Sequence, residues 1–112
     1  MYQALLAARE LAKEKIEVMV LNSHTVKPLD ERKIIDLAKL TSAVVTVEEH
    51  SVVGGLGGAV AELLAKHAPV PIEFIGMQDV FGESGSPAQL LEKYGMDIKS
   101  IKMAVKKVLR RK

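Results

Sequence analysis

The stretch EEHSVVGGLGGAVAELL (residues 48–64) decides the fold of this chain and raises the question of what its glycines do. It overlaps AVVTVEE (43–49), a short β-branched apolar run that is typical of a buried strand. After the glycines, apolar residues follow helical spacing, namely Leu56, Ala59, Val60, Leu63 and Leu64. The stretch therefore predicts a strand, a glycine-rich turn and a helix in direct succession.

A similar succession precedes this stretch. Residues 2–15 carry apolar side chains at helical spacing, and IEVMVLN (16–22) then switches to a short β-branched run. Beyond Pro28, the carboxylate of Asp30 is suited to cap a second helix that leads into the strand at 43–49. The N-terminal half thus predicts helix, strand, helix and strand.

The C-terminal part predicts one more strand, IEFIG at 72–76, followed by two helices. Ser86 and Pro87 suit the N-cap and first position of a helix that Gly95 ends. Asp97 then suits the N-cap of a separate, basic final helix.

Alternation of strands and helices predicts the α/β class, with helices on both faces of a small, mainly parallel sheet. A length of 112 residues is typical of one domain, so we expect a single three-layer α/β/α domain over residues 1–112. The absence of cysteine excludes a disulfide framework and a thiolate metal site, and fits a cytoplasmic protein. No apolar run approaches the ~20 residues that a bilayer requires, so we expect no membrane partner.

Three predicted strand-to-helix loops share the carboxyl edge of the sheet, where open α/β folds bind ligands. Their polar side chains are His24, Glu48, Glu49, His50, Asp79, Glu83 and Ser84. The histidines lack the helical spacing of metal ligands, and no complete nucleophile motif is present. We therefore expect no metal site and no catalytic residue.

The glycine segment has two interpretations. The dinucleotide fingerprint G-x-G-x-x-G fails, because Val60 occupies its third glycine position when the count starts at Gly55. In the structural interpretation, Gly54 and Gly55 form a tight turn, while Gly57 and Gly58 let the helix approach the sheet. This interpretation assigns the glycines to packing.

The other interpretation is an anion or substrate site at the helix start. Backbone N–H groups of a glycine-rich helix N-terminus bind anions, and His50 lies beside two acids that favour its charged form. His50 would then contact phosphate or transfer a proton, or it would only order its own loop. The candidate contacts of this site are His50, Gly54, Gly55, Gly57 and Gly58.

The excess positive charge lies at the end of the chain, in KMAVKKVLRRK (102–112), although the net charge is only +2. Nucleic-acid binding is one meaning of such a cluster. We favour a helix with cations on its solvent face, over a buried stripe of Ile98, Ile101, Val105, Val108 and Leu109. Few aromatic residues are available to stack on bases, so we expect no nucleic-acid partner.

Four motifs in order resemble the C-terminal domain of transketolases, including the form in which the enzyme is split between two polypeptides. They are HTVKPLD (24–30), TVEEHSVVGGLGGAVAELL (46–64), FGESG (81–85) and LLEKYGMD (90–97). Together they cover nearly the whole chain, and FGESG is more similar to transketolase than to related thiamine enzymes.

The resemblance implies an enzyme of the pentose phosphate pathway that transfers a two-carbon ketol unit between sugar phosphates. Such enzymes hold thiamine diphosphate and Mg between domains that are not in this sequence. The resemblance implies that this domain supplies no cofactor ligand and is inactive alone. Its expected role is architecture, dimer contacts or regulation, with the remaining transketolase domains or subunits as partners and a homo-oligomer as the assembly.

One departure from the family concerns its first strand, which is central in the sheet and precedes the first helix. This chain begins inside that helix, so we expect a fragment, or a chain that depends on a partner to fill the sheet. Two alternative functions remain. One is a small phosphate- or nucleotide-binding module that uses the Gly54–Gly58 loop, and the other is a protein-interaction module.

Overall fold

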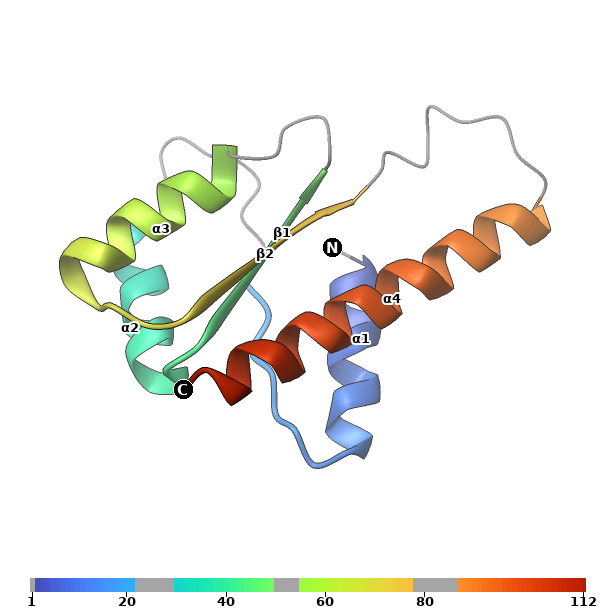
Figure 1. The fold of residues 1–112 in the computed structure, drawn as a ribbon, viewed down its shortest axis with the longest axis horizontal. Coiled ribbons are helices and arrows are strands. Elements are labelled where there is room, and N and C mark those ends of the chain that lie inside the picture. The colour runs from blue at the N-terminus through green and yellow to red at the C-terminus, as the bar shows by residue number, and fades with distance from the viewer. Residues whose placement is uncertain (1, 22–29, 50–54, 78–86) are drawn as a thin grey trace.

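The computed structural model describes residues 2–21, 30–49, 55–77 and 87–112. These residues form an α/β fold in which helices cover both faces of a small parallel sheet (Figure 1). The elements are α1 (Tyr2–Lys13), α2 (Glu31–Thr41), β1 (Val44–Glu49), α3 (Gly55–His67), β2 (Ile72–Met77) and α4 (Pro87–Arg110). The predicted fold class is confirmed.

The sheet of the described residues has two strands, β1 and β2, which pair in parallel. The register runs from Val44 opposite Ile72 to Glu49 opposite Met77. Because parallel neighbours need a crossover connection, the chain between them forms α3. Both strands therefore end at the same edge, at which α3 begins (Figure 1).

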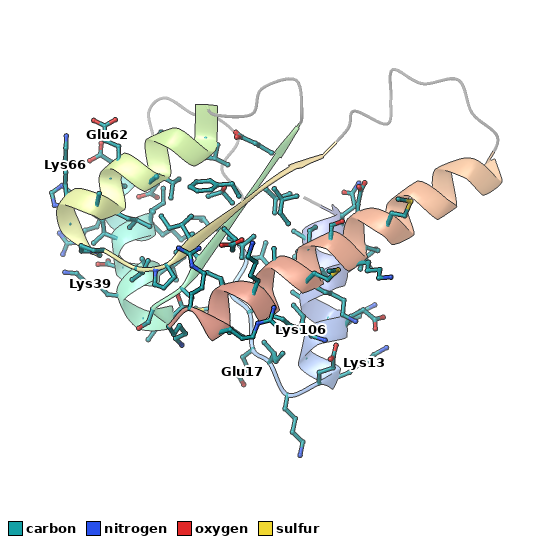
Figure 2. The ribbon with its side chains drawn as sticks, viewed as in Figure 1. Lys13, Glu17, Lys39, Glu62, Lys66 and Lys106 are labelled. Atoms are coloured by element: carbon teal, nitrogen blue, oxygen red, sulfur yellow. The ribbon has the colours of Figure 1, made fainter. Side chains whose placement is uncertain are left out.

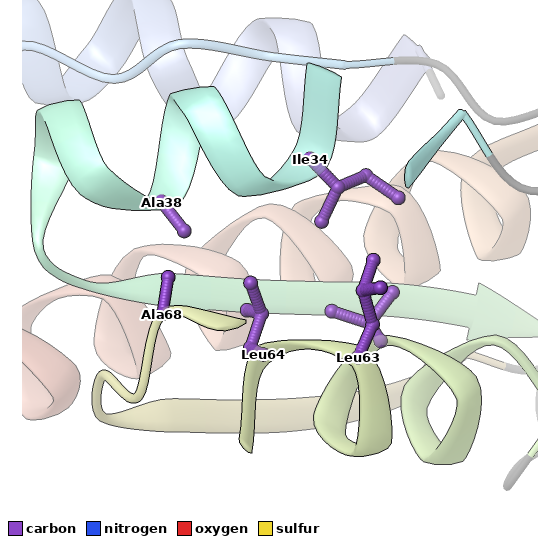
Figure 3. Close-up of a cluster of buried hydrophobic side chains, with 6 residues drawn as sticks. Ile34, Ala38, Leu63, Leu64 and Ala68 are labelled. Atoms are coloured by element: carbon purple, nitrogen blue, oxygen red, sulfur yellow. The ribbon is translucent and has the colours of Figure 1, made fainter. Parts of the chain in front are cut away.

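One face of the sheet packs against α2 and α3. Their buried side chains form a core cluster of Ile34, Ala38, Val60, Leu63, Leu64 and Ala68. Figure 3 shows Ile34 and Ala38 of α2 opposite Leu63 and Leu64 of α3. Val44 and Ile72 of the strands pack against this cluster.

The other face packs against α1 and α4, through the buried residues Ala7, Leu11, Ile101 and Val105. The strands contribute Val45, Val47 and Ile75 to this second cluster. Successive strand residues thus point to opposite faces, so Val44 joins one core and Val45 the other. This alternation gives the three-layer α/β/α arrangement that the sequence predicts.

The strand predicted at 16–22 is wrong for residues 16–21, which form no strand in the structure. Ile16 and Val18 pack into the α1/α4 cluster, whereas Leu21 packs against the α2/α3 cluster. The segment therefore has apolar side chains toward both layers, but β1 and β2 pair only with each other among the described residues. The sequence correctly indicated an apolar segment, but not that it lacks a paired strand in the part of the chain that the structure describes.

The two helices predicted after residue 86 are also wrong, because α4 runs without interruption from Pro87 to Arg110. Gly95 does not end the helix, and Asp97 lies inside it rather than at an N-cap. A glycine in a helix interior costs only about 1 kcal/mol relative to alanine. Ile101 and Val105 are buried against α1 and the sheet, and the free energy of this burial outweighs the cost of the glycine. The helix therefore continues through Gly95.

The start of α2 follows the sequence prediction. The backbone N–H of Lys33 donates to Oδ1 of Asp30 over 3.2 Å, so Asp30 is the N-cap. Ser42 ends the helix in the left-handed conformation, with φ of 62°.

None of the helices in the described ranges has the length and apolar character of a membrane span.

Candidate functional site

The predicted site lies at the carboxyl edge of the sheet, between the end of β1 and the start of α3. Several of its residues lie outside the described part of the chain: His24, His50, Gly54, Asp79, Glu83 and Ser84. The described part contains Glu48 and Glu49 at the end of β1, and Gly55, Gly57 and Gly58 among the first four residues of α3.

Glu48 binds one N–H group at the start of α3, where an anion would also bind. The backbone N–H of Leu56 donates to Oε2 of Glu48 over 2.8 Å. A carboxylate at this position satisfies an N–H group that the helix itself leaves unpaired, and it interacts favourably with the helix dipole. The start of α3 is therefore bound by an anionic group of the chain itself.

Sequence reasoning placed Glu48 among the polar edge residues but did not identify this contact. Glu48 lies eight residues before Leu56, whereas a local capping box spans three residues. The useful signal is topological, because a strand that feeds directly into a helix brings its last side chains to the helix start.

Gly57 brings α3 close to the sheet. It is buried, and a Cβ atom at this position would lie 2.8 Å from Cδ1 of Phe74 and 3.3 Å from Oγ1 of Thr46. Phe74 and Thr46 belong to the paired strands β2 and β1. The prediction that Gly57 serves close helix–sheet packing is confirmed.

Gly58 does not have this role, so that part of the prediction is wrong. A Cβ at Gly58 would have no atom within 4 Å, and the residue is exposed. Consecutive helical residues differ by about 100° around the axis, so only one of two adjacent glycines faces the sheet.

Thr46 is the polar residue beneath this contact, and it was not singled out from the sequence. Its exposed fraction is 6%, and its hydroxyl has no hydrogen-bond partner in the part of the chain that the structure describes. An unpaired buried hydroxyl costs about 1–3 kcal/mol. A small side chain at this position nevertheless leaves room for the backbone of α3 at Gly57.

The described residues contain no group of three or more His, Cys, Asp or Glu side chains that could hold a metal ion. His67 lies at the opposite end of α3 from Gly55, away from the carboxyl edge. We therefore derive no catalytic step through thiamine diphosphate or Mg from these residues.

Three lysines of α4, Lys102, Lys106 and Lys107, pair with acids elsewhere in the chain. Nζ of Lys106 lies 2.7 Å from Oε1 of Glu14, and Nζ of Lys102 lies 3.2 Å from its Oε2. Hydrogen bonds from Lys106 and Lys102 hold the pKa of Glu14 below its ordinary value. Ile101, Val105 and Val108 form the buried stripe behind these cations, as the sequence predicted.

A second acid anchors the end of α4 to β2. Glu73 pairs with Lys107 at 3.3 Å and with Arg111, whose guanidinium also donates to the carbonyl of Ile72 over 2.8 Å. Partial burial raises the pKa of Glu73, but the hydrogen bonds from Lys107 and Arg111 outweigh it and leave the pKa lowered. These ion pairs join residues far apart in sequence, so residue spacing did not predict them.

The comparison with known families rests on nearly the whole chain. The model of the transketolase C-terminal domain matches residues 1–101. The chain belongs to the transketolase C-terminal domain family. The helices and strands described above are therefore those of a transketolase C-terminal domain.

Its relatives are longer proteins. The 6-deoxy-6-sulfo-D-fructose transketolase subunit SqwH of Clostridium sp. (strain MSTE9) is 50% identical over 110 residues, which cover 98% of this chain and 34% of the relative. The putative transketolase C-terminal section of Methanocaldococcus jannaschii is 44% identical over 100 residues, which cover 88% of this chain and 31% of that protein.

A solved structure has the same fold. It is described as a split gene transketolase, an inactive beta4 tetramer, and it matches with a TM-score of 0.80 at 48% identity. The match covers 97% of this chain and 36% of that chain. This chain therefore spans about a third of the length of these three relatives.

Proposed function

We propose that this chain is the C-terminal part of a transketolase and contributes architecture rather than catalytic groups. The observation that carries the proposal is the hydrogen bond from Leu56 to Glu48, because it places a carboxylate of the chain itself at the helix start that a phosphate would use. The contact of Gly57 with the sheet supports the same assignment. On this proposal the chain alone is inactive and supplies no catalytic, cofactor or metal ligand.

The parent enzyme then transfers a two-carbon ketol unit between sugar phosphates, with thiamine diphosphate and Mg bound by its other parts. The partners of this chain are those remaining domains or subunits, in a homo-oligomeric cytoplasmic enzyme. The support comes from relatives described as a subunit, as a C-terminal section and as a tetramer. The proposal assigns no nucleic-acid or membrane partner.

We further propose that a strand of the remaining transketolase parts completes the sheet of this domain. Ile16 and Val18 pack into the α1/α4 cluster and Leu21 packs against the α2/α3 cluster. Glu17 and Met19 remain exposed and leave this part of the second face uncovered. Within the described residues, β1 pairs only with β2, so its other edge has no strand beside it. An added strand would satisfy the backbone groups at that edge.

Reconstitution tests this function. The chain is mixed with a polypeptide that carries the diphosphate- and pyrimidine-binding domains of a split transketolase, and ketol transfer is measured. We expect the mixture to be active and this chain alone to be inactive. Hydrogen exchange at residues 16–21 should slow in the mixture. Activity of the chain alone, or exchange that is unchanged in an active mixture, would contradict the proposal.

A further inference from the structure

The outer side of the α1/α4 layer carries an open groove, which we call the α1/α4 groove. It has a volume of about 530 Å³ and an apolar floor made by Leu6, Ile98 and Met103. Three lysines line it as well, Lys99, Lys102 and Lys106. Figure 2 shows Lys106 on the α4 side of the molecule.

The lysines of this groove carry more positive charge than their neighbours neutralise. Lys102 and Lys106 share one carboxylate, that of Glu14. The other acid of the groove, Glu10, pairs with Lys13 of its own helix. Lys99 forms no ion pair with any described residue. The groove therefore has an apolar floor with a net positive charge.

Exposed methionines extend the apolar surface along α4. Met96 and Met103 are 65% and 61% exposed, and they lie seven residues apart on one face of the helix. Lys99 lies between them, four residues before Met103. A second, smaller hollow of about 290 Å³ adjoins Met103 on the side of Lys107 and Arg110. Apolar and cationic groups thus alternate along the solvent face of α4.

We propose that the α1/α4 groove binds an acidic amphipathic helix of another polypeptide. The groove extends along α4 from Gly95 to Lys106, which corresponds to about 16 Å or three helical turns. A helix of that length can place apolar side chains over Met103 and carboxylates opposite Lys99. This proposal rests on the charges and shape of the groove and does not depend on the proposed function.

Two other occupants fit less well. In a second copy of this chain, packing α4 against α4 would bring the lysine rows together, and like charges repel. A nucleic acid would find phosphate contacts at the lysines, but the described residues that line the groove include no aromatic side chain on which bases could stack. An acidic helix satisfies both the apolar floor and the cationic rim.

The test measures binding of a labelled helical peptide of about 15 residues, long enough for four turns, by fluorescence anisotropy. The probe carries leucines seven residues apart, flanked by glutamates, and a second probe replaces every glutamate by glutamine. We expect saturable binding of the glutamate probe, with shifts of the labelled methyl groups of Ile98 and Met103. We also expect weaker binding of the glutamine probe.

Charge reversal locates the site. Lys99→Glu should weaken binding about fivefold, because it replaces one attraction by a repulsion. Lys39→Glu is the matched control, because Lys39 is an exposed residue of α2 on the opposite layer (Figure 2), and it should leave binding unchanged. Circular dichroism should show that both variants remain folded.

Three results would overturn the proposal. The first is no saturable binding of the glutamate probe, or equal binding of the glutamine probe. The second is the same loss of affinity in Lys39→Glu as in Lys99→Glu, which would indicate diffuse charge attraction. The third is tighter binding of a single-stranded oligonucleotide of equal length at the same methyl groups, which would assign the groove to nucleic acid.

Discussion

Replacing Gly57 by alanine tests the packing of α3 on the sheet, with Gly58→Ala as a control one residue away. The new Cβ at position 57 would lie 2.8 Å from the ring of Phe74 and 3.3 Å from the hydroxyl of Thr46. Phe74 is 56% exposed, whereas Thr46 is buried and less able to move away from the new Cβ. A Cβ at position 58 would meet nothing within 4 Å.

Two terms set the expected stability of these variants. Alanine is favoured over glycine in a helix by up to about 1 kcal/mol, and this term applies equally to both positions. Overpacking adds a cost of about 1–3 kcal/mol at position 57 only. We therefore expect Gly58→Ala to be neutral or to stabilise by up to about 1 kcal/mol. Gly57→Ala should be about 1–3 kcal/mol less stable than Gly58→Ala, and Gly57→Val less stable still.

Urea unfolding followed by circular dichroism measures these free energies of unfolding. The double variant Gly57→Ala with Phe74→Ala should lose less stability than the sum of the two single variants, because it removes the ring that the new Cβ would touch. Equal stability of Gly57→Ala and Gly58→Ala would refute the close-packing argument. The same holds if the double variant shows purely additive losses.

Three further predictions concern single contacts. Glu48→Ala should lower the free energy of unfolding by about 1 kcal/mol. Glu48→Gln should lower it by less, because glutamine keeps an acceptor for the Leu56 N–H. Equal losses of the two variants in urea titrations would exclude a role for the hydrogen bond. Gly95→Ala should stabilise the chain by about 1 kcal/mol, because the residue is helical and exposed and a Cβ there would meet no atom within 4 Å. A lower melting temperature of this variant would contradict a continuous α4. Because ion pairs lower the pKa of Glu14 and Glu73 in the folded state, their stabilisation is complete above the unfolded pKa of about 4.3 and is lost as pH falls through the folded pKa. Glu14→Gln should therefore flatten the fall of the urea midpoint between neutral and acid pH, and an unchanged pH profile would contradict the assignment.

Much of the fold could be predicted because the signals are local. The apolar spacing of α3, the β-branched runs of β1 and β2 and the cap at Asp30 each depend on neighbours within a few residues. The two wrong elements depend on distant parts of the chain. Residues 16–21 have the composition of a strand but pair with no strand in the described ranges, and Gly95 would end an isolated helix more readily than one held by buried Ile101.

The candidate site was harder to predict for the same reason. The glycine pattern gave two adjacent candidates, and only the orientation of α3 distinguishes buried Gly57 from exposed Gly58. The contact of Glu48 with Leu56 requires the geometry of the strand-to-helix connection. The pairs of Glu14 with α4 join residues about 90 positions apart in sequence, beyond the reach of any spacing rule.

The central claim is that this transketolase C-terminal domain supplies architecture and no cofactor or phosphate site. The most direct test is an NMR titration of the backbone amides with thiamine diphosphate plus Mg, and separately with ribose 5-phosphate. We predict no saturable shift with either ligand at Gly55–Gly58, where Glu48 already binds the N–H of Leu56. Saturable shifts at these amides would contradict the proposal and identify the glycine segment as a phosphate site, and larger shifts in Glu48→Gln would show that Glu48 competes with the ligand.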